Sequence, residues 1–124
     1  MSRRVLVADD EPSIVTAVEF LLRREGYEVE IARDGREALE LIEASPPDLV
    51  VLDVMMPQKS GYEICRSIRG RDDWRHIKVI MLSAKGRDAE VTKGMALGAD
   101  AYVTKPFSTR DLVARVNTLL EDRR

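Results

Sequence analysis

The sequence has few of the residues that carry redox or histidine chemistry. It contains one cysteine, one histidine and one tryptophan. A single cysteine cannot form an internal disulfide, and the apolar neighbours of Cys65 on an expected helix indicate a small packed side chain. The histidine, His76, shares the polar segment 70–76 with Trp74. We expect solvent exposure there and assign no function to either residue.

A surplus of positive charge is also missing. The chain has 20 basic and 22 acidic residues and a net charge of -2, whereas proteins that bind a phosphate backbone rely on a basic surplus. We therefore expect no direct nucleic-acid binding. The first residues lack the apolar core of a signal peptide and no membrane span is expected, so we predict a cytoplasmic protein. A length of 124 residues suits one compact domain, 1–124.

Four short apolar runs each end at polar residues. They are 5–8, followed by Asp9-Asp10; 49–52, followed by Asp53; 79–82, followed by Ser83; and 101–104, followed by Lys105-Pro106. The first three are continuous apolar runs, which are typical of strands that helices cover on both faces. Segment 28–31 alternates polar and apolar residues instead, which predicts an outer strand.

Five helices are expected to alternate with the strands. The first begins at Pro12 and stops at Gly26, the second begins at Asp34 and ends before Pro46-Pro47, the third begins at Ser60, the fourth runs from about Asp88 to Leu97, and the last begins at Ser108. Capping-box partners stand three residues after three of these starts, at Glu37, Glu63 and Asp111. The fourth helix has few apolar residues and contains Gly94, so we expect it to be the least firmly held.

This alternation predicts an α/β, doubly wound fold. Right-handed crossovers place helices on both faces of an open parallel sheet. Ligands bind such sheets beyond the carboxyl ends of the strands. The polar residues that follow the apolar runs are therefore expected to meet at one edge of the sheet.

Asp9, Asp10 and Asp53 would bring three carboxylates into that crevice. Their repulsion is costly unless a hard cation neutralises them, and Mg2+ prefers carboxylate, water and phosphate oxygens. Taken singly, Asp9 and Asp10 are about as well explained as turn or helix-start residues. Asp53 is poorly explained as a cap, because it ends an apolar run and precedes Val54-Met55-Met56. A carboxylate there can act as a nucleophile and form an aspartyl phosphate.

Ser83 and Lys105 fit the same site better as a set than as single residues. A strand-end serine often caps the following turn, and a lysine is often a solvated surface residue. Their placement favours phosphate contact, and the proline after Lys105 restricts where its ammonium points. Tyr102 is more often a packed strand aromatic than a switch, and only its position on the last strand raises the second interpretation.

Together these motifs resemble the response regulator receiver domain of two-component signalling. The residues concerned are Asp9-Asp10-Glu11, Leu52-Asp53, Met56-Pro57 with Gly61, Ser83-Ala84 and Lys105-Pro106-Phe107. They span nearly the whole chain. The resemblance implies a flavodoxin-like, five-stranded sheet with strand order 2-1-3-4-5.

The resemblance further implies a role for each site residue. Asp53 would accept a phosphoryl group from a histidine kinase or a phosphotransfer protein. The ligands of Mg2+ would be Asp9, Asp10, Asp53 and the backbone carbonyl of Met55. Lys105 would pair with a phosphoryl oxygen, Ser83 would donate its hydroxyl, Tyr102 would move inward, and the bond before Pro106 would be cis.

The negative charge gained at Asp53 would act as a switch. We expect the fourth helix, the last strand and the last helix to form the output face, read by a target protein or by an output domain of a longer regulator. Asp100, Asp111 and Arg115 resemble part of the charged set through which winged-helix regulators dimerise, although Ala101 replaces a common acid. A phosphorylation-dependent homodimer is therefore a further expectation.

Two residues bear on how long the phosphoryl group would last. Met55 and Lys85 flank the expected site and offer no carboxylate or amide to orient an attacking water, which predicts slow self-dephosphorylation. Apart from that reaction, we expect a signalling domain and not an enzyme.

Two other classes of protein share parts of this pattern. A flavin-binding electron carrier needs a loop rich in hydroxyls and glycines where this chain has Asp9-Asp10-Glu11-Pro12. A magnesium-dependent phosphohydrolase needs a placed general acid or base and a substrate cap, for which 124 residues leave little.

Overall fold

The computed structural model describes residues 3–84 and 88–121, and over these the chain alternates strands with helices. The strands are β1 (Arg4–Ala8), β2 (Glu28–Ala32), β3 (Leu49–Asp53), β4 (Lys78–Ser83) and β5 (Ala101–Thr104). The helices are α1 (Pro12–Arg24), α2 (Gly35–Ala44), α3 (Gly61–Arg69), α4 (Asp88–Ala96) and α5 (Thr109–Leu120), with a short 3-10 helix, η1 (Asp72–Trp74), before β4. The expected elements are therefore all present.

The five strands form one parallel sheet in the order β2-β1-β3-β4-β5, which confirms the expected doubly wound fold. β2, with its alternating sequence, lies at one edge, and β5 lies at the other. In β1, Val5 is in register with Val29 of β2 and with Leu49 of β3. The continuous apolar runs of β1, β3 and β4 are therefore the three inner strands.

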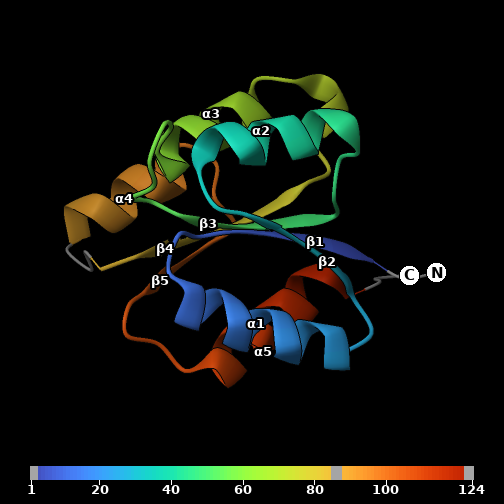
Figure 1. Cartoon of the computed structure of the whole chain (residues 1–124). Helices are drawn as coiled ribbons and strands as arrows, with labels where there is room; N and C mark the ends of the chain where they lie inside the picture. The colour runs from blue at the N-terminus through green and yellow to red at the C-terminus, as the bar shows by residue number, and fades with distance from the viewer. Residues whose placement is uncertain (1–2, 85–87, 122–124) are drawn as a thin grey trace.

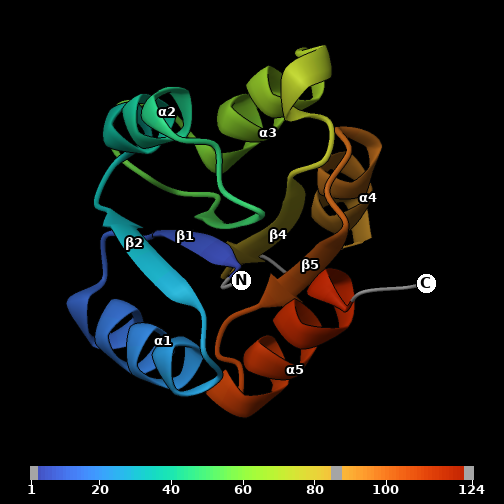
Figure 2. The same cartoon turned by 90° about the vertical axis from the view of Figure 1, so that its right-hand side faces the viewer.

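Helices cover both faces of the sheet. Figure 1 shows α2 and α3 on one face and α1 and α5 on the other, and Figure 2 shows α4 beside β5 on the side of α3. Successive residues of a strand contribute in turn to the cores on the two faces of the sheet. Leu6 and Ala8 belong to the core under α2 and α3, whereas Val5 and Val7 belong to the core against α1 and α5. Both sets are buried, which explains why the inner strands are apolar throughout.

The helix starts follow the expected signals, with one variation. At α3, Ser60 and Glu63 form the complete capping box. At α2, the carboxylate of Asp34 accepts a hydrogen bond from the Glu37 amide. The carboxylate of Glu37, however, accepts from the amide of Arg33, one residue before the expected partner.

The two ends of α1 agree with prediction, and α4 has the sparse burial expected of it. Pro12 is the first residue of α1, and Gly26 follows the helix with a φ of +95°. Among the residues of α4 whose side chains the structure describes, 90–96, only Gly94 is buried. Within residues 3–84 and 88–121, none of the helices combines the length and the apolar character that a transmembrane span requires.

The segment that precedes β4 corrects one expectation. Trp74 was expected in a solvated loop, but it is 3% exposed because η1 turns its ring into the core beneath α2 and α3. The guanidinium of Arg71 lies 3.9 Å from the centre of that ring and covers it. His76 is exposed, as expected. Cys65 is buried, and its thiol lies 3.5 Å from the carbonyl of Leu97 as a hydrogen-bond donor.

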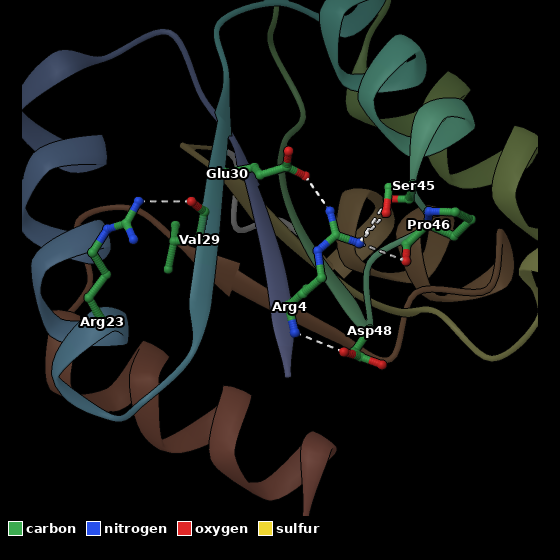
Figure 3. A network of polar contacts seen from close by, with 7 residues as sticks. All are labelled: Arg4, Arg23, Val29, Glu30, Ser45, Pro46 and Asp48. Carbon is green, nitrogen blue, oxygen red and sulfur yellow. Dashed lines mark hydrogen bonds and ion pairs between the residues drawn. The ribbon is translucent and has the colours of Figure 1, made fainter. Parts of the chain in front are cut away.

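A polar network holds the amino ends of β1 and β2 to the loop between α2 and β3 (Figure 3). The guanidinium of Arg4 is 2.7 Å from the carboxylate of Glu30 on β2. It also donates to the hydroxyl of Ser45 at 2.8 Å and to the carbonyls of Ser45 and Pro46. The backbone amide of Arg4 donates to Asp48 at 2.8 Å. Arg4 thus donates hydrogen bonds to the backbone carbonyls of the two residues that follow α2.

Replacing Arg4 with methionine keeps the apolar stem and removes the guanidinium. Because the partly buried carboxylate of Glu30 and three exposed acceptors lose their donor, we expect the free energy of unfolding to fall by about 1 kcal/mol. Urea denaturation followed by circular dichroism measures the change. Arg36→Met is the matched control, since Arg36 makes only an exposed i,i+4 pair with Glu40. An equal loss in both variants would contradict the role of the Arg4 network.

Candidate functional site

The carboxyl ends of the strands bring the predicted site residues to one edge of the sheet. Asp9 directly follows β1, Asp53 is the last residue of β3, Ser83 is the last residue of β4, and Lys105 directly follows β5. Asp9, Asp53 and Ser83 are buried, whereas Asp10 is exposed. A parallel sheet has this effect because every strand runs toward the same edge.

Three carboxylates form the acidic cluster that the sequence predicted. One oxygen each from Asp9, Asp10 and Asp53 lies within 4.8 Å of the others. Asp9 Oδ1 accepts a hydrogen bond from the amide of Glu11 at 2.9 Å, and Asp53 Oδ1 accepts one from the amide of Met55 at 3.2 Å. The second oxygen of each of these two carboxylates lies near the ammonium of Lys105.

The donor set fits a hard divalent cation. Asp9 Oδ2 is fully buried, and within the described part of the chain no hydrogen bond reaches it. The ammonium of Lys105, 3.3 Å away, is an ion-pair partner and not an aligned donor. A buried carboxylate oxygen without a hydrogen bond is costly. Carboxylate oxygens are ligands that a hard cation such as Mg2+ prefers. A cavity of about 140 Å³ beside Asp9 and Asp10 opens between α1 and β2, but Asp53 does not line it.

Lys105 is the cation of the site. Its Nζ lies 2.7 Å from Glu11 Oε1, 3.3 Å from Asp9 Oδ2 and 3.4 Å from Asp53 Oδ2. The peptide bond from Lys105 to Pro106 is cis. The backbone amide of Lys105 donates to the carbonyl of Ser83 at 2.7 Å, which continues the pairing of β5 with β4 beyond Thr104.

These charges shift the protonation of Asp53 and Lys105. Burial raises the pKa of Asp53, the charge of Asp9 raises it further, and Lys105 and the amide of Met55 lower it, with a result of about 6 against an ordinary 3.8. Burial lowers the pKa of Lys105, but the hydrogen bond to Glu11 and the charges of Asp53 and Asp9 outweigh it and the net shift is upward. At neutral pH Asp53 is therefore mainly ionised and lies beside a charged Lys105.

The loop from 54 to 60 is held against the end of β3 by backbone contacts. The amide of Val54 donates to the carbonyl of Leu82 at 2.8 Å, and the amide of Gly61 donates to the carbonyl of Val54 at 3.0 Å. A Cβ on Gly61 would lie 2.6 Å from the carbonyl oxygen of Asp53. Only glycine lets α3 begin this close to the strand, which keeps Met55 beside Asp53. The side chain of Met55 is 62% exposed.

Ser83 and Tyr102 lie on neighbouring strands at the side of the sheet that α4 covers. Ser83 is fully buried. Tyr102 is half-buried and packs on the core under α3, and a Cβ on Gly94 of α4 would lie 2.8 Å from its ring. Tyr62 of α3 completes the contact: burial, followed by a hydrogen bond with Tyr102, raises the pKa of Tyr62 to about 12. The ammonium of Lys93 lies 4.5 Å from the Tyr62 ring centre.

The residues expected on a dimer face are not equally available. Asp100 accepts from Arg69 at 2.9 Å and from the amide of Val79 at 2.8 Å. Arg69 also donates to the carbonyls of Gly98 and Ile77, at 2.8 and 2.7 Å. Asp100 thus anchors the turn before β5 within the chain.

Asp111 and Arg115 are exposed on α5. The two residues therefore remain available on that surface.

Lys85, which was expected to flank the phosphoryl site together with Met55, lies outside the described residues.

Sequence reasoning missed two groups that the geometry brings into or beside the site. Glu11 belongs to the Asp9-Asp10-Glu11 motif, but the sequence suggested no role for it, although its carboxylate is the closest to Lys105. The signal was present as a third acid at the end of β1. The sequence around Tyr62 does not indicate its contact with Tyr102, because only the packing of α3 beside β5 brings the two rings together.

We expect Asp53→Asn to raise the thermal midpoint of the metal-free protein. The folded-state pKa of about 6 exceeds the ordinary 3.8, so the folded state binds more protons between about pH 4 and pH 6 and loses stability as pH rises through that range. The gain should be largest at pH 8 and small near pH 4.5, measured by thermal denaturation in a chelator.

Asp73→Asn is the control for this comparison. A hydrogen bond from Arg71 lowers the pKa of Asp73, so its replacement should not raise the midpoint. A midpoint of Asp53→Asn equal to or below that of the wild type at pH 8 would contradict the electrostatics described here.

Comparison with known proteins supports one family. The sequence profile of the response regulator receiver domain matches residues 5–117. The chemotaxis response regulator CheY4 of Vibrio cholerae is 32% identical, with a TM-score of 0.90, and the match covers 97% of this chain and 100% of that one. A BeF3-activated DrrB receiver domain is 38% identical, with a TM-score of 0.89, over 98% of this chain and 100% of that one.

Full-length DrrB of Thermotoga maritima, an OmpR/PhoB homolog, is 39% identical, with a TM-score of 0.89. That match covers 98% of this chain and 54% of DrrB. Profile, fold and identity agree, and the acidic cluster and the lysine lie where the motifs of the family predicted them. The chain belongs to the response regulator receiver domain family, whose members accept phosphoryl groups in two-component signalling.

Proposed function

We propose that Asp53 accepts a phosphoryl group from the phosphohistidine of a histidine kinase or phosphotransfer protein, with Mg2+ as cofactor. The observation that carries this proposal is the position of Asp53 between the acidic cluster and Lys105. With a pKa of about 6, its carboxylate is mainly ionised at neutral pH and able to attack phosphorus. Surface acids lack this combination of burial, neighbouring carboxylates and a shared ammonium.

In the transfer, a carboxylate oxygen of Asp53 forms a bond to phosphorus. The bond from phosphorus to the imidazole nitrogen of the donor breaks, and its electron pair stays on that nitrogen. Mg2+, held by Asp9, Asp10, Asp53 and the backbone carbonyl of Met55, would neutralise charge on the phosphoryl oxygens. Lys105 would stabilise the same charge from the side of β5, where its Nζ is 3.4 Å from Asp53.

The charge of the phosphoryl group on Asp53 would then act on the rest of the domain through Ser83 and Tyr102. The hydroxyl of Ser83 would donate to the phosphoryl group, and the resulting movement of Ser83 would change the packing of Tyr102 against α4. That contact is close, because the Tyr102 ring lies directly beneath Gly94. The sparse burial of α4 makes it the element whose position changes at the lowest cost.

The surface of α4, β5 and α5 is the proposed output face. A target protein or an attached output domain would bind there, and residues 1–124 would form the single receiver domain of a cytoplasmic regulator. The match to part of full-length DrrB supports an attached output domain. A phosphorylation-dependent homodimer would use Asp111 and Arg115 on this face and would leave Asp100 paired with Arg69.

Incubation with acetyl phosphate and Mg2+ should add one phosphoryl group to the protein. We expect the mass gain to be lost on chelation and in Asp53→Ala, because the nucleophile is removed. Intact-protein mass spectrometry measures the gain. Asp72→Ala, which removes an exposed acid far from the site in sequence, is the control and should be modified normally. Modification of Asp53→Ala to the wild-type extent would refute the assignment.

The exposed side chain of Met55 supports slow self-dephosphorylation. The backbone amide of Met55 donates to Asp53, and the side chain has no polar group to orient a water for attack on the acyl phosphate. We expect Met55→Asn to speed decay of the phosphorylated protein by roughly tenfold, less than the roughly 10²–10⁴-fold that a positioned general acid or base contributes, because an amide only orients the water. Decay after removal of the donor, followed by mass spectrometry, measures this. Met55→Leu should decay like the wild type, and unchanged or slower decay in Met55→Asn would rule the explanation out.

A further inference from the structure

The ammonium of Lys105 is shared among three carboxylates, and its closest partner is not the proposed phosphoacceptor. Glu11 lies at 2.7 Å, against 3.3 Å for Asp9 and 3.4 Å for Asp53. The side chain of Lys105 is 13% exposed, so these partners and not bulk water satisfy most of its charge. Glu11 differs from the other two in being 53% exposed.

An ammonium has three N–H donors. Those of Lys105 form hydrogen bonds to Glu11 and Asp53, whereas Asp9 Oδ2 is an ion-pair partner without an aligned hydrogen bond. Glu11 holds the shortest of these contacts, so a phosphoryl oxygen on Asp53 would compete with it for the ammonium. Asp9 and Asp53 belong to the acidic cluster. Among the described residues, Glu11 is not part of that cluster, and it is the partner that water reaches.

We propose that Glu11 is a positioning residue, the counter-ion of Lys105 in the unphosphorylated domain, and that a phosphoryl group on Asp53 displaces it. The inference rests on the proposed function, because the displacing group is the phosphoryl group. Glu11 holds the ammonium at the site while Asp53 is unmodified. It then leaves, and Lys105 turns to the phosphoryl oxygens.

The exposures decide which partner leaves. A half-exposed carboxylate regains water when its ion pair breaks, whereas a buried one does not, so releasing Glu11 costs the least. Three carboxylates, those of Asp9, Glu11 and Asp53, surround one lysine, and Asp10 lies in the acidic cluster with two of them. Moving the charge of Glu11 away therefore also relieves repulsion against the incoming phosphoryl oxygens.

The side chain of Glu11 can be changed without disturbing α1. Glu11 stands at the cap position of the helix, but its side chain makes no capping hydrogen bond. The helix is joined to this residue through its backbone: the amide of Glu11 donates to Asp9, and its carbonyl accepts from Val15. A Glu11→Gln variant keeps both bonds and removes only the charge.

The test uses beryllofluoride, a stable mimic of the phosphoryl group, titrated calorimetrically into the wild type, Glu11→Gln and Glu40→Gln at saturating Mg2+. Glu40 is a matched control, because it is also exposed and paired with one cation, Arg36, on α2. We expect Glu11→Gln to bind beryllofluoride roughly two- to fivefold more tightly, the range that the loss of one partly exposed ion pair allows. Glu40→Gln should bind like the wild type.

Affinity for Mg2+ alone separates this role from that of a metal ligand. Glu11→Gln should bind Mg2+ less tightly, because the site loses a negative charge and Lys105 is left to Asp9 and Asp53. Tighter beryllofluoride binding with weaker Mg2+ binding supports the inference. Unchanged or weaker beryllofluoride binding overturns it, and a fall in both affinities would assign Glu11 to the metal site. A wild type that binds no beryllofluoride would overturn the proposed function and the inference with it.

Discussion

Within residues 3–84 and 88–121, the ammonium of Lys105 is the cation that pairs with the carboxylates of Asp9, Glu11 and Asp53, all within 3.4 Å of it. Without it, three acids at the ends of two neighbouring strands would repel one another in a buried setting. Its position depends on β5, because the residue after Thr104 must reach across the end of β4 toward β3. The site is therefore a property of the assembled sheet, and the layers on both faces serve to hold that edge in register.

The rest of the fold fixes some parts of that edge and leaves others loosely held. Gly61 presses α3 against the end of β3, and the Arg4 network secures the opposite end of the sheet. Arg69 and Asp100 tie the turn before β5 to α3. Between these anchors, α4 buries little besides Gly94 on the ring of Tyr102. This sparse burial among the described residues of α4 supports the proposal that a charge change at Asp53 moves this helix.

Agreement between sequence and structure was best where the signals are local. The inner strands were predictable because burial on both faces removes polar residues, and the start of α3 because Ser60 and Glu63 bond to backbone groups only three residues apart. The expectation of a solvated loop at Trp74 was wrong, because its neighbours in sequence are polar whereas its ring packs on the core. The charge of Asp100 alone does not reveal that Arg69 pairs with it within the chain, and the place of this exposed residue on a dimer face stays a prediction.

The sequence by itself determined the order of the elements, the acids and the lysine that end the strands, and the family that these motifs resemble. Such features follow from propensity, capping and periodicity over a few residues. Only the tertiary structure decided which charges meet: Lys105 is 52 residues from Asp53 and 94 from Glu11 in sequence, yet it pairs with both. Which residues that are remote in sequence come into contact depends on strand order and register, because parallel crossovers bring remote strand ends together at one edge.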